Sequence, residues 1–194
     1  MTQLLEGRSA IVTGGSRGIG RGICLALARD GADVVFNYFA GADAEYDRDA
    51  ADTLVSEIEA MGRRAKAIDG DISDGAIAAD LVAEAQGMMG GIDILASNAG
   101  ICPFHAFLDM PADLWQRVID VNLTGALHIV QAAANAMADQ DTGGAIVATS
   151  SISALVGGEF QAHYTPTKAG VHSLMQSVAI PLGRKGIRCN SVLP

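Results

Sequence analysis

A glycine-rich segment near the N-terminus constrains the fold of this chain most strongly. Residues 13–20 (TGGSRGIG) follow an apolar, strand-like run at residues 9–12 and open a helical pattern. The glycines Gly14, Gly18 and Gly20 allow a tight turn and a close approach of the main chain to a ligand. Because a helix N-terminus attracts anions, this strand, loop and helix predict a site for the pyrophosphate of a dinucleotide.

Strand-like and helical patterns alternate along the rest of the chain. Strands are predicted at residues 10–12, 33–36, 65–68, 93–96, 145–149 and 187–192. Helices are predicted at residues 18–29, 47–61, 75–88, 112–138 with a break, and 161–183. Repeated β-α-β units imply a parallel sheet with helices on both faces. We therefore predict an α/β fold: a Rossmann-type, doubly wound parallel sheet in three layers (α/β/α) with strand order 3-2-1-4-5-6, as one domain over residues 1–194.

Composition excludes several classes of protein. The net charge is −9, which argues against nucleic-acid binding, and no apolar run is long enough to span a membrane. The N-terminal residues 1–6 lack the basic and apolar regions of a signal peptide. Three scattered cysteines, Cys24, Cys102 and Cys189, are too few for a disulfide framework. The cysteine pattern therefore predicts a cytoplasmic protein. Cys102 and His105 lack a second pair of metal ligands, so we predict no metal site.

Three polar residues near the fifth predicted strand suggest a reaction centre. Ser151 follows that strand, Tyr164 comes thirteen positions later, and Lys168 lies four positions after Tyr164. A helix that begins near Ala162 would place Tyr164 and Lys168 on one face and leave Pro166 within about the first turn. A free tyrosine has a pKa of about 10, and a nearby ammonium group would favour the phenolate. The three residues therefore suit proton transfer to or from a substrate oxygen, which Ser151 would orient.

The chain resembles the short-chain dehydrogenase/reductase family in five motifs that occur in the order of the family. They are Thr13-Gly14-x-x-x-Gly18-Ile19-Gly20, Asn98-Ala99-Gly100, Asn122, Ser151 and Tyr164-x-x-x-Lys168. The resemblance implies an oxidoreductase with the catalytic residues Asn122, Ser151, Tyr164 and Lys168, and a homo-oligomer, either tetramer or dimer. In the family, the asparagine interrupts a helix and holds a water that links the lysine to solvent. The resemblance also implies a continuation of about sixty residues, longer than a connecting loop, with a nicotinamide-binding loop and a substrate lid.

The same resemblance implies a nicotinamide cofactor. The predicted contacts are Gly14, Ser16, Arg17, Gly18, Ile19, Gly20, Asn37, Tyr38, Asp71, Ile72, Asn98, Ala99, Gly100, Tyr164 and Lys168. NAD-selective members carry a carboxylate where Tyr38 stands, and Arg17 could pair with a 2′-phosphate, so we predict NADP with NAD possible. Acidic residues at positions 43–52 oppose that preference. Asp71 resembles the adenine-binding aspartate of the family; Asp74 or Ser73 fits better as the cap of the next helix.

Segments around Cys102, Ser151 and Tyr164 are similar to sugar 1-dehydrogenases of the family that act on L-rhamnose. A small sugar is therefore the predicted substrate, oxidised at its anomeric hydroxyl to the lactone. The predicted substrate contacts are Ser151, Ser153, Tyr164, His105 and Gln161. Two alternatives remain open from the sequence: a reductase of 3-oxoacyl thioesters or other ketones on the same fold, and a dinucleotide-binding protein without catalysis.

Overall fold

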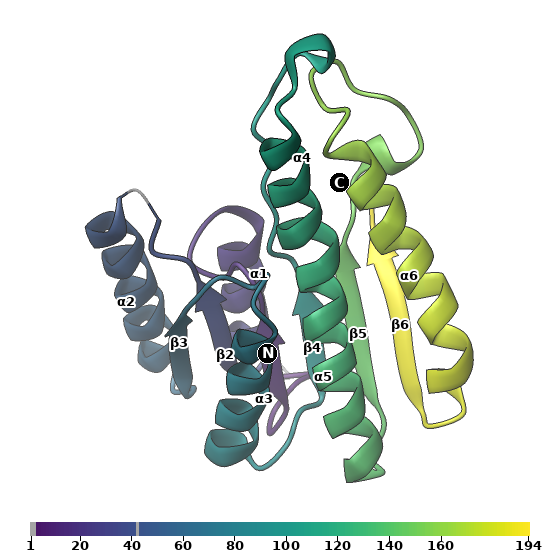
Figure 1. Ribbon diagram of the computed structural model, residues 1–194. Coiled ribbons are helices and arrows are strands. Elements are labelled where there is room, and N and C mark those ends of the chain that lie inside the picture. The colour runs from purple at the N-terminus through teal and green to yellow at the C-terminus, as the bar shows by residue number, and fades with distance from the viewer. Residues whose placement is uncertain (1–2, 42) are drawn as a thin grey trace.

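Six parallel strands form the sheet of the computed structural model, which describes residues 3–41 and 43–194 (Figure 1). The strands are β1 (Ser9–Val12), β2 (Asp33–Tyr38), β3 (Ala65–Asp69), β4 (Ile94–Ser97), β5 (Gly144–Thr149) and β6 (Ile187–Val192). Their order is β3-β2-β1-β4-β5-β6, with every neighbouring pair parallel, which confirms the predicted topology. Met1 and Thr2, part of the N-terminal segment where no signal peptide is predicted, lie outside the described residues.

Helices connect the strands and cover both faces of the sheet. They are α1 (Gly18–Arg29), α2 (Ala44–Ala60), α3 (Gly75–Met89), α4 (Ala112–Ile119), α5 (Gly125–Gln140) and α6 (Thr165–Gly183). One buried apolar cluster joins α3, α5 and α6 to the sheet, and a second joins α1 and α2 to the opposite face. Figure 1 shows α3 and α5 in front of the sheet and α1 behind it. The three predicted layers are therefore confirmed.

Local sequence explains where several helices begin and end. Asp43 caps α2 by accepting a hydrogen bond from the backbone N–H of Tyr46, and Asp74 caps α3 through the N–H of Ala76. The helix α2 therefore begins at Ala44, three residues before the predicted start. Gly90 ends α3 in the left-handed conformation, at φ 84°, which costs a glycine little.

The start of α6 differs from the prediction. The helix begins at Thr165 rather than near Ala162, and Tyr164 is its N-cap residue. The carbonyl of Gln161 accepts hydrogen bonds from the N–H groups of Tyr164 and Thr165, so the preceding residues form a turn. Pro166 then lies in the first helical turn, where its missing N–H would have no partner in the helix.

The predicted break between residues 112 and 138 is a π-helical segment. This segment, η2 (Asp120–Thr124), joins α4 to α5 and carries Asn122. Short 3-10 helices lie at η1 (Phe107–Asp109) and η3 (Ile152–Ala154). Among the described helices, none has the length and apolar character needed to cross a membrane.

Candidate active site

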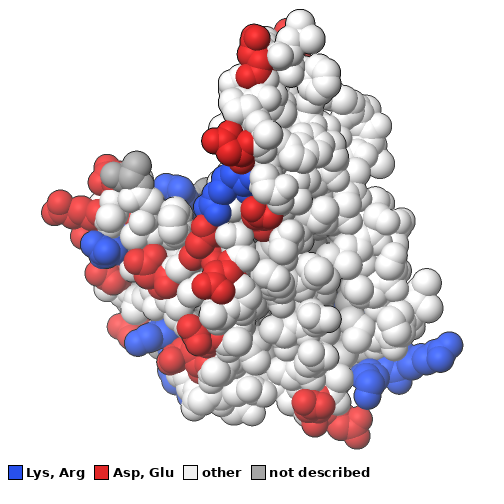
Figure 2. Space-filling view, viewed as in Figure 1, with Lys and Arg blue, Asp and Glu red and all other residues white. Residues whose placement is uncertain are grey.

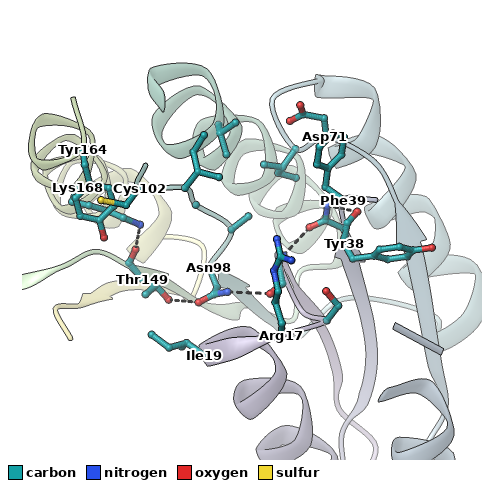
Figure 3. Close-up of a pocket in the computed structure, with 18 of the residues that line it drawn as sticks. Arg17, Ile19, Tyr38, Phe39, Asp71, Asn98, Cys102, Thr149, Tyr164 and Lys168 are labelled. Carbon is teal, nitrogen blue, oxygen red and sulfur yellow. Dashed lines mark hydrogen bonds between the residues drawn. The ribbon is translucent and has the colours of Figure 1, made fainter. Parts of the chain in front are cut away.

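A cavity of about 420 Å³ opens at the carboxyl ends of the parallel strands. This is the edge at which open α/β sheets bind their ligands. The cavity runs from the glycine-rich loop and the end of β2 to Tyr164 and Lys168 on α6 (Figure 3). Its lining consists of Gly14, Ser16, Arg17, Ile19, Asn37, Tyr38, Phe39, Gly70, Asp71, Ile72, Asn98, Ala99, Gly100, Ile101, Cys102, Arg117, Val121, Thr149, Ser150, Ser151, Tyr164, Lys168 and Pro194.

The glycine-rich loop has the geometry of a phosphate cradle. Gly14 adopts φ 64°, and a Cβ on Gly20 would lie 2.0 Å from the carbonyl oxygen of Gly14. Only glycine therefore permits this close packing of the loop against α1. Arg17 precedes the first residue of α1, and no side chain caps the N-terminal N–H groups of the helix. These open donors fit the pyrophosphate of a dinucleotide.

Two asparagines hold the loop in place. The Asn37 side chain accepts a hydrogen bond from the N–H of Gly14 at 2.9 Å and donates to the carbonyl of Gly70 at 2.9 Å. The Asn98 side chain donates to the carbonyls of Thr13 and Gly14 at 3.1 and 3.3 Å. Both residues line the cavity, and their side chains tie the glycine loop to the ends of neighbouring strands.

Arg17 and Tyr38 lie at one end of the cavity, with Asp71 and Phe39 beside them (Figure 3). Arg17 forms an ion pair with Asp47 on α2, at 2.8 Å between guanidinium and carboxylate. Burial and the nearby carboxylate of Asp69 raise the pKa of Tyr38. The cation expected to meet a 2′-phosphate therefore already has a carboxylate partner within the protein.

Asp71 is more heavily engaged than the sequence suggested. Its carboxylate accepts hydrogen bonds from the N–H and hydroxyl of Ser73, at 3.0 and 2.8 Å, and pairs with Arg117 on α4 at 2.6 Å. Burial raises the pKa of Asp71, but these hydrogen bonds and the Arg117 charge outweigh burial and lower it. Asp74, not Asp71, caps α3, as predicted. The guanidinium of Arg117 also lies 6.0 Å from the ring centre of Phe39.

The opposite end of the cavity holds Tyr164 and Lys168. The ammonium nitrogen of Lys168 lies 5.6 Å from the centre of the Tyr164 ring and donates to the carbonyl of Thr149 at 2.8 Å. Ser150 fixes the first turn of α6 by donating its hydroxyl to the carbonyl of Lys168 at 2.8 Å. Lys168 is 4 % exposed, and burial lowers its pKa from 10.5 to about 8.

The pKa of Tyr164 differs from the expected direction in this structure. Burial raises the pKa of the phenol, whereas a hydrogen bond with Ser151 lowers it by a smaller amount. Because burial of the phenol dominates, the predicted lowering of this pKa by Lys168 is not seen. Ser151 therefore lies near enough to affect the phenol, while Lys168 lies against the aromatic ring.

Asn122 occupies the π-helical segment between α4 and α5 and is 1 % exposed. Its side-chain carbonyl accepts from the N–H of Ile101 at 2.8 Å, and its amide donates to the carbonyl of Ile101 at 2.9 Å. The amide also donates to the hydroxyl of Thr167, one residue before Lys168. Asn122 thus links the loop after β4 to the first turn of α6 without lining the cavity itself.

The predicted substrate contacts divide into two groups. Ser151 and Tyr164 line the cavity, and the hydroxyl of Ser153 donates to the side-chain carbonyl of Gln161 at 3.2 Å just beyond it. Burial raises the pKa of the Cys102 thiol, and Gln161 opposes part of that rise. His105 lies outside the lining, with its ring near the carbonyl of Ala106. The lining also leaves out the predicted substrate contacts Ser153 and Gln161, the predicted cofactor contacts Gly18 and Gly20, and the catalytic candidate Asn122.

Sequence reasoning missed several residues that line the site, and Thr149 and Arg117 are two of them. Thr149 accepts from Lys168 through its carbonyl and donates its hydroxyl to Asn98 at 3.2 Å, joining the two ends of the cavity (Figure 3). Its place at the end of a predicted strand was the available signal. Arg117 offers no local signal, because its partner Asp71 is distant in sequence. Among the described residues, no cluster of three histidine, cysteine or acidic side chains could hold a metal ion.

Comparison with known proteins decides the family. The family model "short chain dehydrogenase" matches residues 8–194. This chain belongs to the short chain dehydrogenase family. It is 59 % identical over 192 residues to L-rhamnose 1-dehydrogenase (NAD(P)(+)) of Sphingomonas sp. (strain SKA58), covering 99 % of this chain and 73 % of that protein.

Further relatives agree with this family membership. The chain is 54 % identical over 191 residues to L-rhamnose 1-dehydrogenase (NAD(P)(+)) of Azotobacter vinelandii, covering 98 % of this chain and 73 % of the relative. A crystal structure of a short chain dehydrogenase from Burkholderia cenocepacia J2315 in complex with NADP superposes with a TM-score of 0.89. Its sequence is 37 % identical, and the match covers 98 % of this chain and 75 % of that one. The predicted family is confirmed.

Proposed function

We propose that this chain oxidises the anomeric hydroxyl of a small sugar, with L-rhamnose as the favoured substrate, to the lactone. One observation carries the proposal. Ser151, Tyr164 and Lys168 gather at one end of a cavity whose other end is a glycine-rich loop at an open helix N-terminus. The relatives named for L-rhamnose oxidation, at 59 and 54 % identity, supply the substrate class.

The cradle fits a nicotinamide dinucleotide, which when bound accepts a hydride from the substrate carbon. The loop residues Gly14, Ser16 and Ile19 would hold the pyrophosphate, and Asp71 with Ile72 would hold the adenine. Lys168 would hold the nicotinamide ribose, as the family resemblance implies. Asn98, Ala99 and Gly100 would lie along the dinucleotide.

Tyr164 would act as the general base of the reaction. As the anomeric carbon loses its hydride, the phenolate oxygen takes the hydroxyl proton and the carbon–oxygen single bond becomes the lactone carbonyl. Ser151 lines the cavity together with Tyr164 and would orient the substrate oxygen through its own hydroxyl. Lys168 lies against the ring of Tyr164, 5.6 Å from its centre, and Asn122 would complete a path for the proton to solvent.

We propose that NADP is preferred and that NAD is also used. Tyr38 places no carboxylate at the end of β2, and Arg17 lies at the cavity margin, 68 % exposed at its side chain. An exposed guanidinium there suits a 2′-phosphate, since arginine binds phosphates through paired N–H groups. The names of the two relatives include both dinucleotides.

Ser153 and Gln161 would bind the sugar hydroxyls beyond the reaction centre. They already share a hydrogen bond at 3.2 Å, so each is positioned by the other. An amide and a hydroxyl can reject a substrate that lacks the matching hydroxyl, because their polar atoms would then be left unpaired. His105 stays a prediction as a substrate contact.

We also propose a cytoplasmic homo-oligomer, either tetramer or dimer. Figure 2 shows few charges on the near face over α5 and the adjoining part of α6, in contrast to the charged region over α2 and α3. Trp115 on α4 and Leu127 on α5 are 39 and 42 % exposed. The free thiols of Cys24, Cys102 and Cys189 agree with a reducing compartment. Light scattering on the purified protein would give the number of subunits.

The substrate is tested by absorbance of reduced nicotinamide. Purified protein is given L-rhamnose with NADP or NAD, and the product is trapped with hydroxylamine, which converts a lactone into a hydroxamate. Formation of reduced cofactor with hydroxamate, faster with NADP, is expected. In a parallel reaction, NADPH is offered with a 3-oxoacyl thioester. Thioester reduction without sugar oxidation would favour the ketone-reductase alternative, and cofactor binding with neither reaction would favour a non-catalytic dinucleotide-binding protein.

A further inference from the structure

The two partners of the ion pair between Arg17 and Asp47 differ in their exposure to solvent. The side chain of Asp47 is 7 % exposed, whereas that of Arg17 is 68 % exposed. Asp47 lies in the first turn of α2, where the helix dipole favours a carboxylate. Arg17 therefore faces solvent at the cavity margin, while the carboxylate of Asp47 is enclosed by the protein.

A second contact fixes Asp47 further. One carboxylate oxygen accepts from Arg17 at 2.8 Å, and the other accepts from the backbone N–H of Gly41 at 3.1 Å. Gly41 belongs to the loop that follows β2, the strand that ends at Tyr38. Asp47 thereby joins Arg17, α2 and this loop at the end of the cavity where a 2′-phosphate or a 2′-hydroxyl would lie.

We propose that Asp47 is a specificity-determining residue that sets the balance between NADP and NAD by acting as the resident counter-ion of Arg17. The proposal rests on the proposed function only in placing the 2′ end of the cofactor at Arg17. A 2′-phosphate must share the guanidinium with the carboxylate and approach that carboxylate against like-charge repulsion. A 2′-hydroxyl meets neither cost. Asp47 therefore lowers affinity for NADP and leaves affinity for NAD almost unchanged, so that both cofactors are used.

The variant Asp47→Asn isolates the charge. Asparagine keeps the shape of the side chain and a carbonyl oxygen that can accept from Gly41, but it carries no charge. Arg17 is largely exposed, so water can solvate it once its partner is neutral, and the fold should be retained. Affinity for NADP is expected to rise about five- to tenfold at low salt, while affinity for NAD changes by less than about twofold.

Three further variants act as controls. Asp43→Asn removes the same charge from the same end of α2, and the asparagine carbonyl can still accept the capping hydrogen bond from Tyr46. Asp43 suits this control because it is exposed and has no contact with Arg17 in the described residues. It should leave the ratio of NADP to NAD affinity within about twofold of the wild type. Asp47→Glu keeps the charge and should stay near the wild-type ratio. Arg17→Gln should remove the effect of Asp47→Asn when the two are combined.

The affinities are measured by calorimetric titration of NADP and NAD in the absence of sugar, so no hydride transfer is needed. An unchanged affinity ratio in Asp47→Asn, or an equal rise in Asp43→Asn or on the Arg17→Gln background, would overturn the proposal. Failure of the wild type to bind either dinucleotide would overturn it too. If Asp47→Asn does not fold by circular dichroism, Asp47→Ser, which keeps a small acceptor for Gly41, carries the same test. A protein that binds both cofactors but does not oxidise L-rhamnose would refute the proposed function alone.

Discussion

Replacement of Lys168 by methionine tests how much the buried ammonium group costs the fold. Lys168 is 4 % exposed and its pKa falls from 10.5 to about 8 because of burial. A difference of this size corresponds to about 3 kcal/mol of destabilisation when the lysine is protonated in the folded state. Its hydrogen bond to the carbonyl of Thr149 returns about 1 kcal/mol. At neutral pH, the free energy of unfolding of Lys168→Met is therefore expected to equal or exceed that of the wild type.

The pH dependence of this difference is the decisive part. Between pH about 8 and 10.5 the unfolded chain keeps the Lys168 proton while the folded chain loses it, so wild-type stability rises with pH. The wild type should gain about 3 kcal/mol of unfolding free energy relative to Lys168→Met across that window. Urea unfolding followed by circular dichroism at a series of pH values measures it.

The exposed Lys185, just beyond α6, provides a matched control. Lys185→Met should show no such pH-dependent difference. A wild-type minus Lys168→Met difference that stays flat within about 0.5 kcal/mol over the window would refute the reasoning. A loss of more than about 2 kcal/mol in Lys168→Met at pH 7 would refute it as well, because packing and hydrogen bonding would then outweigh the cost of burial.

Three further predictions concern the loop, the π-helical segment and the reaction. Gly20→Ala should abolish dinucleotide binding in a calorimetric titration, because its Cβ would meet the carbonyl of Gly14 at 2.0 Å; Gly22→Ala, with open space around it, should bind normally. Asn122→Ala should lower the unfolding free energy by about 2 kcal/mol, since it leaves the partly buried N–H and carbonyl of Ile101 without their side-chain partner; a cost under about 0.5 kcal/mol would contradict this. Sugar oxidation should accelerate as pH rises, because burial raises the pKa of Tyr164 and the base must be deprotonated; a rate that falls from pH 7 to 9 would argue against the tyrosine as base.

The strand order could be predicted because the signals that set it are local. The apolar runs that become β1 and β4 alternate with helical patterns, and short β-α-β connections leave few topologies open. The start of α6 was placed three residues early because residues 162–164 fit a helical pattern equally well. The turn that ends at Tyr164 depends on the carbonyl of Gln161, which the pattern does not reveal.

The candidate site was predictable wherever its residues lie just after a strand. Ser151, Asp71 and Asn98 all follow predicted strands, so the parallel sheet brings them to one edge. Ion pairs between a loop residue and a helix residue distant in sequence could not be predicted, as Asp71 with Arg117 and Arg17 with Asp47 illustrate. Such pairs depend on how α2 and α4 pack against the sheet, and no local sequence pattern indicates which residues will pair.

The most direct test of this account compares the wild type with Tyr164→Phe. Reduced-nicotinamide absorbance is recorded with L-rhamnose and NADP, and NADP binding is titrated in the same preparations. The account predicts steady formation of reduced cofactor by the wild type and loss of turnover by at least about a thousandfold in Tyr164→Phe, with NADP affinity unchanged. Near-normal turnover by Tyr164→Phe would contradict the assignment of Tyr164 as the base.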